Sequence, residues 1–373
     1  MRRMDDEPAS VLYAEQFDEL FGALAARGYA CVGPTVRDDA IVYDDIACSA
    51  DLPRGWTDEQ APGRYRLTQR GDRAFFGYAV GPHSWKKYLF PPARRLWQLT
   101  RADRTFERID EPVDVPQYAF IGVRACEIAA LKIQDRVFTG GQSIEPRYLA
   151  TRAKAFVVAV NCTQSAATCF CVSMDTGPQV SDGDDLSLTE VLQPRHCFVV
   201  RAGSARGREV LAALNVSPLT PDIENAAAAG IDQATRQSRK LETVGLKELL
   251  QQNHDSAQWQ DIATRCLSCA NCTMACPTCF CSSVDDVTDL SGEHAERWQR
   301  WDSCFNAGFS YIHGGEVRKT TASRYRQWLT HKLSSWYDQF GSSGCVGCGR
   351  CIAWCPVGID LTEEARKMQE AQA

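Results

Sequence analysis

Eight cysteines near the end of the chain fall into two runs with the same spacing, C-x2-C-x2-C-x3-C-P. The first run has its cysteines at Cys266, Cys269, Cys272 and Cys276, and the second at Cys345, Cys348, Cys351 and Cys355. Thiolates are soft ligands that suit iron and zinc, and this spacing is the bacterial ferredoxin signature for [4Fe-4S] clusters. The repeated run therefore predicts two such clusters, with iron bound through these thiolates.

The fourth cysteine of each run predicts how the two clusters are bound. Three thiolates on a tight turn into a helix bind three irons of one cubane, and the proline after the fourth cysteine redirects the chain toward the other cluster. The predicted ligands are Cys266, Cys269, Cys272 and Cys355 for the first cluster, and Cys345, Cys348, Cys351 and Cys276 for the second. Structural zinc is the alternative, but a zinc site needs only four ligands in total.

A third metal site is predicted in the first half of the chain. Cys126 lies just past the apolar run 118–123, and Cys162 lies just past the apolar run 156–160. If these runs are neighbouring parallel strands, both thiols emerge at the carboxyl edge of the sheet, where α/β proteins place ligands. The loop 161–172 supplies two more thiols. The ligands predicted for a third iron–sulfur cluster are Cys126, Cys162, Cys169 and Cys171. The alternative is that these are ordinary buried cysteines.

The tetrapeptide Thr-Cys-Phe-Cys occurs twice, ending at Cys171 and at Cys281. A rival arrangement joins the cysteines of both copies across a domain interface, namely Cys169, Cys171, Cys279 and Cys281. Cys304 follows the second copy and has no assigned role. Three further cysteines have no partners by spacing and are interpreted as structural: Cys31, Cys48 and Cys197.

The elements around these cysteines predict an α+β fold. Strand character at 118–123 and 156–160 flanks a helical pattern at 127–138, and strand–helix–strand order gives parallel neighbours. Further strands are predicted at 41–46, 74–80 and 197–200, with helices at 13–24 and 208–214. Residues 1–230 are therefore predicted to form an α/β domain with a mixed sheet, which holds the third cluster.

Residues 231–373 are predicted to form a helical, ferredoxin-like domain with two [4Fe-4S] clusters. The gap between Cys276 and Cys345 is longer than a compact ferredoxin needs. An amphipathic helix is expected within the gap, from Tyr325 to Phe340, and Gly341 ends it. Its aromatic face would shield the clusters from water, which helps to set a reduction potential.

Composition excludes several classes of function. The chain has 373 residues, 18 cysteines and a formal net charge of −6, which favours neither a disulfide framework nor nucleic-acid binding. No stretch is long enough to span a membrane, and residues 1–7 lack the following apolar core of a signal peptide, so a cytoplasmic protein is expected. No dinucleotide or Walker A motif is present, and no catalytic constellation is found, so the chain is not expected to bind a nucleotide or flavin itself.

Two basic features have open interpretations. The lysines in 81–87 would either face a phosphate or a partner, or lie solvated at the start of a helix. Arg124, beside Cys126, would either stabilise a reduced cluster or form a structural ion pair.

Together these motifs resemble the iron–sulfur β subunits of cytoplasmic [NiFe] hydrogenases of the sulfhydrogenase type, and the related A subunit of anaerobic sulfite reductase. The matching segments run through most of the chain, at 81–86, 122–127, 161–162, 169–171, 177–178, 276–281 and 344–351. The family often has Arg-Pro-Cys-Asp where this chain has Arg-Ala-Cys-Glu at 124–127, which leaves the role of Glu127 open.

The resemblance implies a subunit that relays electrons within an oxidoreductase complex. Its partners would be a flavin subunit that uses NAD(P)H, a small iron–sulfur subunit and a large [NiFe] subunit. In the sulfite reductase version, the terminal partner carries sirohaem instead. A hypothesis of another class is an iron–sulfur redox sensor, but clusters with crossed ligation suit electron passage better, and no DNA-binding element is visible.

Overall fold

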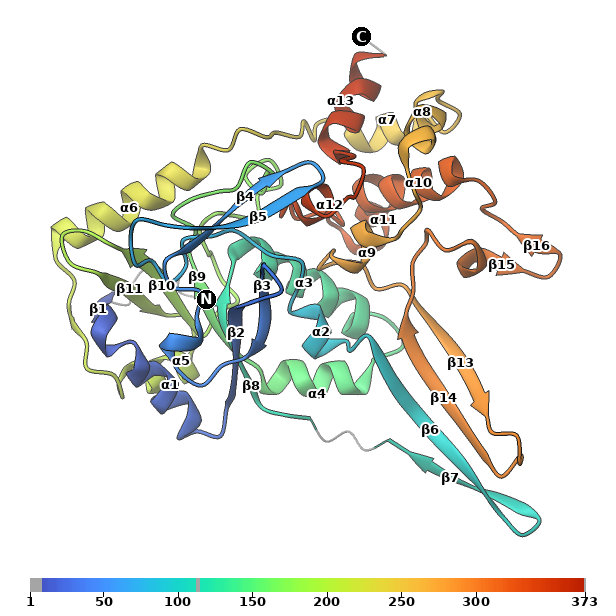
Figure 1. Cartoon of the computed structure of the whole chain (residues 1–373), viewed down its shortest axis with the longest axis horizontal. Coiled ribbons are helices and arrows are strands. Elements are labelled where there is room, and N and C mark those ends of the chain that lie inside the picture. The colour runs from blue at the N-terminus through green and yellow to red at the C-terminus, as the bar shows by residue number, and fades with distance from the viewer. Residues whose placement is uncertain (1–8, 112–114, 372–373) are drawn as a thin grey trace.

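A mixed eight-stranded sheet forms the centre of the first half of the molecule (Figure 1). The computed structural model describes residues 9–111 and 115–371, so the segment 1–7 lies outside it. The strand order is β12-β1-β11-β10-β9-β8-β2-β3, and the central strands from β2 to β10 are parallel. The strands are β1 (Ser10–Tyr13), β2 (Ala30–Arg37), β3 (Ala40–Asp45), β8 (Tyr118–Val123), β9 (Phe156–Val160), β10 (Leu186–Val191), β11 (Cys197–Ala202) and β12 (Ser217–Pro218). The predicted mixed sheet and α+β fold class are confirmed.

Helices cover both faces of this sheet, which explains why β9 is an unbroken apolar run. Phe156 and Val158 pack with the helices on one face, whereas Val157 and Ala159 pack with those on the other. The first face is covered by α1 (Asp18–Ala25) and α5 (Ala205–Leu211), and the second by α3 (Ala125–Thr139) and α4 (Pro146–Lys154). The helix predicted at 13–24 begins only at α1, because the chain before it pairs as β1.

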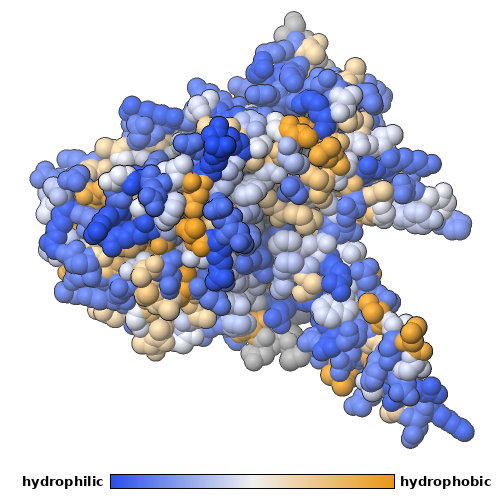
Figure 2. Space-filling model, in the orientation of Figure 1, coloured by the Kyte–Doolittle hydropathy of each residue, from blue (hydrophilic) through white to orange (hydrophobic). Residues whose placement is uncertain are grey.

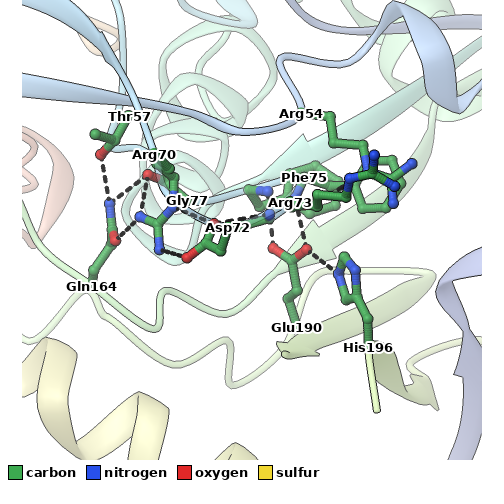
Figure 3. Close-up of polar contacts among 12 residues, drawn as sticks. Arg54, Thr57, Arg70, Asp72, Arg73, Phe75, Gly77, Gln164, Glu190 and His196 are labelled. Carbon is green, nitrogen blue, oxygen red and sulfur yellow. Dashed lines mark hydrogen bonds and ion pairs between the residues drawn. The ribbon is translucent and has the colours of Figure 1, made fainter. Parts of the chain in front are cut away.

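The strand predicted at 74–80 does not form. The backbone N–H groups of Phe75 and Phe76 donate to the carboxylate of Glu190, at 2.7 and 2.9 Å, and not to a neighbouring strand. Figure 3 shows this irregular segment held by polar side chains, with Arg70 donating to Gln164 at 2.6 Å. The apolar residues of the segment are buried in the core, so composition alone suggested a strand.

Four strands from distant parts of the chain form a projecting arm, seen at the lower right of Figure 1. They are β6 (Ala93–Ala102), β7 (Thr105–Asp110), β13 (Ser282–Thr288) and β14 (His294–Trp301), in the order β13-β14-β6-β7. Figure 2 shows that this arm is mostly hydrophilic, with a few apolar residues exposed along it. The prediction of a helical second half is therefore wrong for the segment that holds β13 and β14.

Short helices surround the two cysteine runs in the rest of the second half. They are α7 (Leu246–Gln252), α8 (Gln258–Arg265), α9 (Asn271–Met274), α10 (Thr321–Thr330), α11 (Trp336–Phe340), α12 (Arg350–Ala353) and α13 (Leu361–Glu370). A π-helical turn, His331–Ser335, joins α10 to α11, so the helix expected before Gly341 is present. Gly341 ends it in a left-handed conformation, with φ of 69°.

Among the remaining elements, one 15-residue helix packs against β10 and β11, and the others are short. The remaining elements are α2 (Lys86–Leu89), α6 (Pro221–Thr235), the hairpin β4 (Trp56–Ala61) and β5 (Arg64–Gln69), the pair β15 (Tyr311–Ile312) and β16 (Gly315–Glu316), and three 3-10 turns (Ala14–Gln16, Ser49–Asp51 and Ala307–Ser310). Within the described ranges, no helix is both long enough and apolar enough to cross a lipid bilayer.

Candidate metal centres

Three thiols of the first run line a cavity together with two cysteines of the second run. α8 ends at Cys266, and the loop from there into α9 is tight because Ser268 and Ala270 take left-handed conformations, with φ of 51° and 67°. The cysteines at the cavity wall are Cys266, Cys269, Cys272, Cys351 and Cys355. The four thiols predicted for the first cluster therefore share one cavity.

The other residues of this cavity suit an anionic cluster. Tyr325 and Trp328, from the predicted amphipathic helix, line it and are buried. The Tyr325 hydroxyl and the Trp328 indole nitrogen are enclosed and have no hydrogen-bond partner among the described residues. Buried polar groups are normally paired, and cluster sulfurs accept hydrogen bonds from such donors. Four thiols that can bind iron, beside two unpaired hydrogen-bond donors, therefore fit an iron–sulfur cluster.

Cys276 of the first run lies among the thiols of the second run. Burial raises the pKa of Cys345 to about 12, and repulsion from Cys348 and Cys276 contributes to the rise. Burial also holds the pKa of Cys351 well above its usual value, with Cys345, Cys348 and Cys276 adding to it. Thiols crowded in this way bind protons strongly on their own, whereas bound metal deprotonates them outright. The four predicted ligands of the second cluster are thus neighbours.

Two glycines let the second run approach the loop that carries Cys169 and Cys171. Gly347 and Gly349 have φ of 65° and 75°, a conformation that other residues rarely adopt. A Cβ atom on Gly347 would lie 2.6 Å from the Cα atom of Cys171. The N–H of Phe170 donates to the carbonyl of Gly347 at 2.9 Å. The second run and the loop 161–172 are therefore in direct backbone contact.

The four cysteines predicted for the third cluster also line one cavity. Cys126 lies in the first turn of α3, directly after β8, and Cys162 follows β9, which pairs with β8 in parallel. The cysteines at the cavity wall are Cys126, Cys162, Cys169 and Cys171, together with Cys348 of the second run. Parallel pairing thus brings the two strand ends to the same edge of the sheet, as the sequence predicted.

Polar side chains contact two of these thiols. The Arg124 guanidinium lies 3.9 Å from the Cys162 sulfur, and the amide of Gln237 donates to the Cys171 sulfur at 3.1 Å. Burial raises the pKa of the Cys162 thiol, and Arg124 offsets part of that rise. Burial raises the pKa of Cys171 to about 11, against the lowering effect of the Gln237 hydrogen bond. Arg124 therefore faces the site, as one of its two interpretations requires.

Glu127, whose role the sequence left open, is the centre of a buried network. Its carboxylate accepts hydrogen bonds from the Tyr43 hydroxyl at 2.7 Å and from the Trp85 indole at 3.0 Å. It also accepts the backbone N–H of Arg124 at 3.0 Å and pairs with Arg350. The network includes residues on both sides of Cys126 and fixes the start of α3. Sequence reasoning missed Arg350, because nothing local relates it to Glu127.

The remaining cysteines separate into two sets. Cys279 and Cys281 lie near Cys276 and Cys304 and are absent from the cavity that holds Cys169 and Cys171. The geometry therefore does not bring together the four cysteines of the rival arrangement. The three cysteines interpreted as structural lie elsewhere, with Cys31 on β2, Cys48 before a 3-10 turn and Cys197 on β11.

The lysines of segment 81–87 form hydrogen bonds within the protein. Lys86 is buried at the start of α2, where its ammonium group donates to the carbonyl of Cys279 at 3.1 Å. Lys87 donates to the carbonyl of Tyr43 at 2.6 Å. A helix does start here, but Lys86 is neither solvated nor free to bind a phosphate.

Single metal ions have no ready-made site in residues 9–111 and 115–371, where no three His, Cys, Asp or Glu side chains are arranged to hold one. The thiols predicted for the first and third clusters instead line cavities.

The fold and these sites together define the class of protein. A family model described as a 4Fe-4S dicluster domain matches residues 265–359, a range that contains both cysteine runs. The chain is therefore an iron–sulfur protein in which a 4Fe-4S dicluster domain accompanies a mixed sheet.

A relative covers nearly the whole chain. The protein named Sulfhydrogenase 2 subunit beta, from Pyrococcus furiosus, is 29% identical over 363 residues, which make up 96% of this chain and 98% of that protein. This likeness and the dicluster domain confirm the resemblance to iron–sulfur β subunits of the sulfhydrogenase type. No solved structure matches the chain.

Proposed function

We propose that this chain is the electron-relay subunit of a soluble, cytoplasmic [NiFe] hydrogenase. It passes electrons between a flavin subunit that uses NAD(P)H and the small iron–sulfur and large [NiFe] subunits that convert hydrogen. Two [4Fe-4S] clusters are held by the crossed cysteine runs, and a third by the cysteines beside the sheet. The name of the Pyrococcus furiosus relative supports hydrogenase partners over a sirohaem subunit.

The observation that carries this proposal is the way the three groups of thiols adjoin one another. Cys351 of the second run lies at the wall of the first cavity. Cys348, from the same run, lies at the wall of the cavity beside the sheet. The second site is therefore the middle member of a series, as passage of electrons from one end to the other requires.

The residues of the chain position the clusters, bury them and place charged groups beside them. One-electron reduction is the chemistry that the bound clusters provide. Arg124 favours the more negative state of its site because its buried guanidinium faces the Cys162 sulfur. Buried aromatic side chains line the first site, where Cys269 is exposed, and the backbone contact at Gly347 holds the second site against the third.

Anaerobic purification of the native complex tests the proposal. We expect at least about twelve irons per chain, with a similar amount of acid-labile sulfide, since each cubane holds four irons. Reduction by NAD(P)H should produce electron paramagnetic resonance signals of [4Fe-4S] clusters, and a nickel-containing subunit should copurify. A protein without reducible [4Fe-4S] signals would overturn the proposal. A sirohaem partner would assign the relay to sulfite reduction, and recovery of regulatory proteins alone would favour a sensor.

A further inference from the structure

Two cysteines outside the sites above flank the hairpin formed by β13 and β14, and a third, Cys279, lies just before them in the chain. Cys281 directly precedes β13, and Cys304 lies shortly after β14. The strands pair up to their ends, where the N–H of Asp302 donates to the carbonyl of Cys281 at 2.9 Å. The thiols of Cys281 and Cys304 lie beside each other, and each shifts the pKa of the other. Cys279, two residues before Cys281, lies beside Cys276 in the same way.

Two buried lysines converge on this group of thiols. Lys332 lies in the π-helical turn between α10 and α11, a kind of distortion that often marks functional sites. Its ammonium group donates to the Cys276 sulfur at 3.3 Å and to Thr278 Oγ1 at 3.0 Å. Lys86 approaches from α2 and lies 3.8 Å from the centre of the Trp301 ring. Each lysine is only 3% exposed.

Within the described ranges, no carboxylate forms an ion pair with the ammonium group of either lysine. Burying an unpaired ammonium group costs several kcal/mol, which hydrogen bonds to carbonyls and a cation–π contact offset only in part. The protein therefore needs negative charge at this place. A cluster bound through Cys276 supplies one anion beside Lys332, but Lys86 contacts Cys279 and not a cysteine of either run.

We propose that Cys279, Cys281 and Cys304 hold a further iron–sulfur cluster through three thiolates, with Lys86 and Lys332 as its buried counter-charges. The fourth corner is left to a ligand other than cysteine, since Cys276 belongs to the second run. Each thiol loses its proton when it binds metal, so the bound site is anionic. A disulfide between Cys281 and Cys304 would be neutral and would leave Lys86 without a compensating negative charge. This site goes beyond the three that the proposed function needs.

The position of the site makes it a branch of the relay. Cys304 neighbours Cys272 of the first run, and Cys279 contacts Cys276, which lies among the second. Cys281 and Cys304 flank the β13–β14 hairpin, which belongs to the projecting arm in Figure 1. A cluster here would therefore lie between the arm and the two dicluster sites.

The double variant Cys281→Ala/Cys304→Ala tests the proposal in the native complex. Iron should fall by about three or four atoms per chain relative to the parent, with a matching loss of sulfide and of one electron paramagnetic resonance signal. Cys48→Ala is the matched control, because Cys48 is distant from these sites, and its iron content should not change. Unchanged iron in the double variant, or zinc in place of iron, overturns the further site.

Two more variants separate this inference from the proposed function and from misfolding. Cys126→Ala reports on the third site, so a loss of iron there without a loss in the double variant rejects only the further site. Lys86→Met keeps all three thiols, and the signal that the double variant lacks should shift to a more negative potential at full iron content. If Lys86→Met shifts no potential, or shifts only signals that survive in the double variant, the assignment of Lys86 is wrong.

Discussion

Arg350 and Glu127 form an ion pair in the interior of the protein, with side chains that are 0% and 1% exposed. Arg350 lies between Cys348 and Cys351 of the second run, and Glu127 directly follows Cys126. The pair therefore joins two of the proposed cluster sites through residues adjacent to their ligands. Because both charges are removed from water, the loss of either leaves the other uncompensated.

Arg350→Met should destabilise the protein by about 3–5 kcal/mol, because it leaves the carboxylate of Glu127 buried without its cation. Guanidinium unfolding of the anaerobically purified protein measures the change. The double variant Glu127→Gln/Arg350→Met should be more stable than Arg350→Met, since no buried charge remains unpaired. An unfolding midpoint for Arg350→Met equal to that of the parent would contradict this account.

Crossed ligation predicts which variants share a spectroscopic effect. Cys355→Ala should remove the same electron paramagnetic resonance signal as Cys266→Ala, because their thiols line one cavity. Cys276→Ala should instead match Cys345→Ala. Each should lose about four irons per chain. If Cys355→Ala matched Cys345→Ala, each run would be binding its own cluster.

Gly347→Ala should destabilise the protein more than Gly341→Ala, although the two glycines have nearly equal φ of 65° and 69°. Each substitution incurs the backbone cost of a left-handed alanine, roughly 1–2 kcal/mol. Only at Gly347 would the new Cβ also overlap the backbone at Cys171, whereas nothing lies within 4 Å at Gly341. Unfolding and iron content of both variants give the comparison, and equal effects would show that the close approach is unimportant.

Gln237→Leu should lower the reduction potential of the site beside the sheet. The variant removes the hydrogen bond to the Cys171 sulfur, and such bonds favour the more negative state of a cluster. If the bond is stronger by about 1 kcal/mol in the reduced state, the shift is roughly 40 mV for one electron. A redox titration followed by electron paramagnetic resonance measures it, with the signals of the other clusters as internal controls. A potential that stays the same or rises would rule out this role for Gln237.

Local patterns in the sequence predicted the parts of the fold that depend on local causes. Ligand spacing within a run is set by one turn of chain, so the grouping of Cys266, Cys269 and Cys272 follows from it. Strands β8 and β9 were predictable because both of their faces are buried and the runs are continuously apolar. Because Cys126 and Cys162 follow these two strands, the sequence also placed both cysteines at the carboxyl edge of the sheet.

Tertiary causes leave no such local signal. β13 is exposed along most of its length and pairs with β14, which in turn pairs with β6 from the other half of the chain. Its residues therefore lack the alternation that marks a half-buried strand. Nothing local in the sequence marks Arg350 and Lys332 as buried, and only the fold shows which thiols and carboxylates surround them. The apolar composition of segment 74–80 suggested a strand. Its backbone N–H groups instead donate to the carboxylate of Glu190, a distant residue that no local pattern could indicate.

The pairing of Thr100 in β6 with His294 in β14 also constrains how the chain is made. A ribosome adds about 5–20 residues per second, so β6 emerges roughly 10 to 40 s before the strand that covers its free edge. An unpaired strand edge is a template for association with other chains. Slow translation between these two strands will therefore lower the yield of soluble protein, whatever the supply of iron and sulfide.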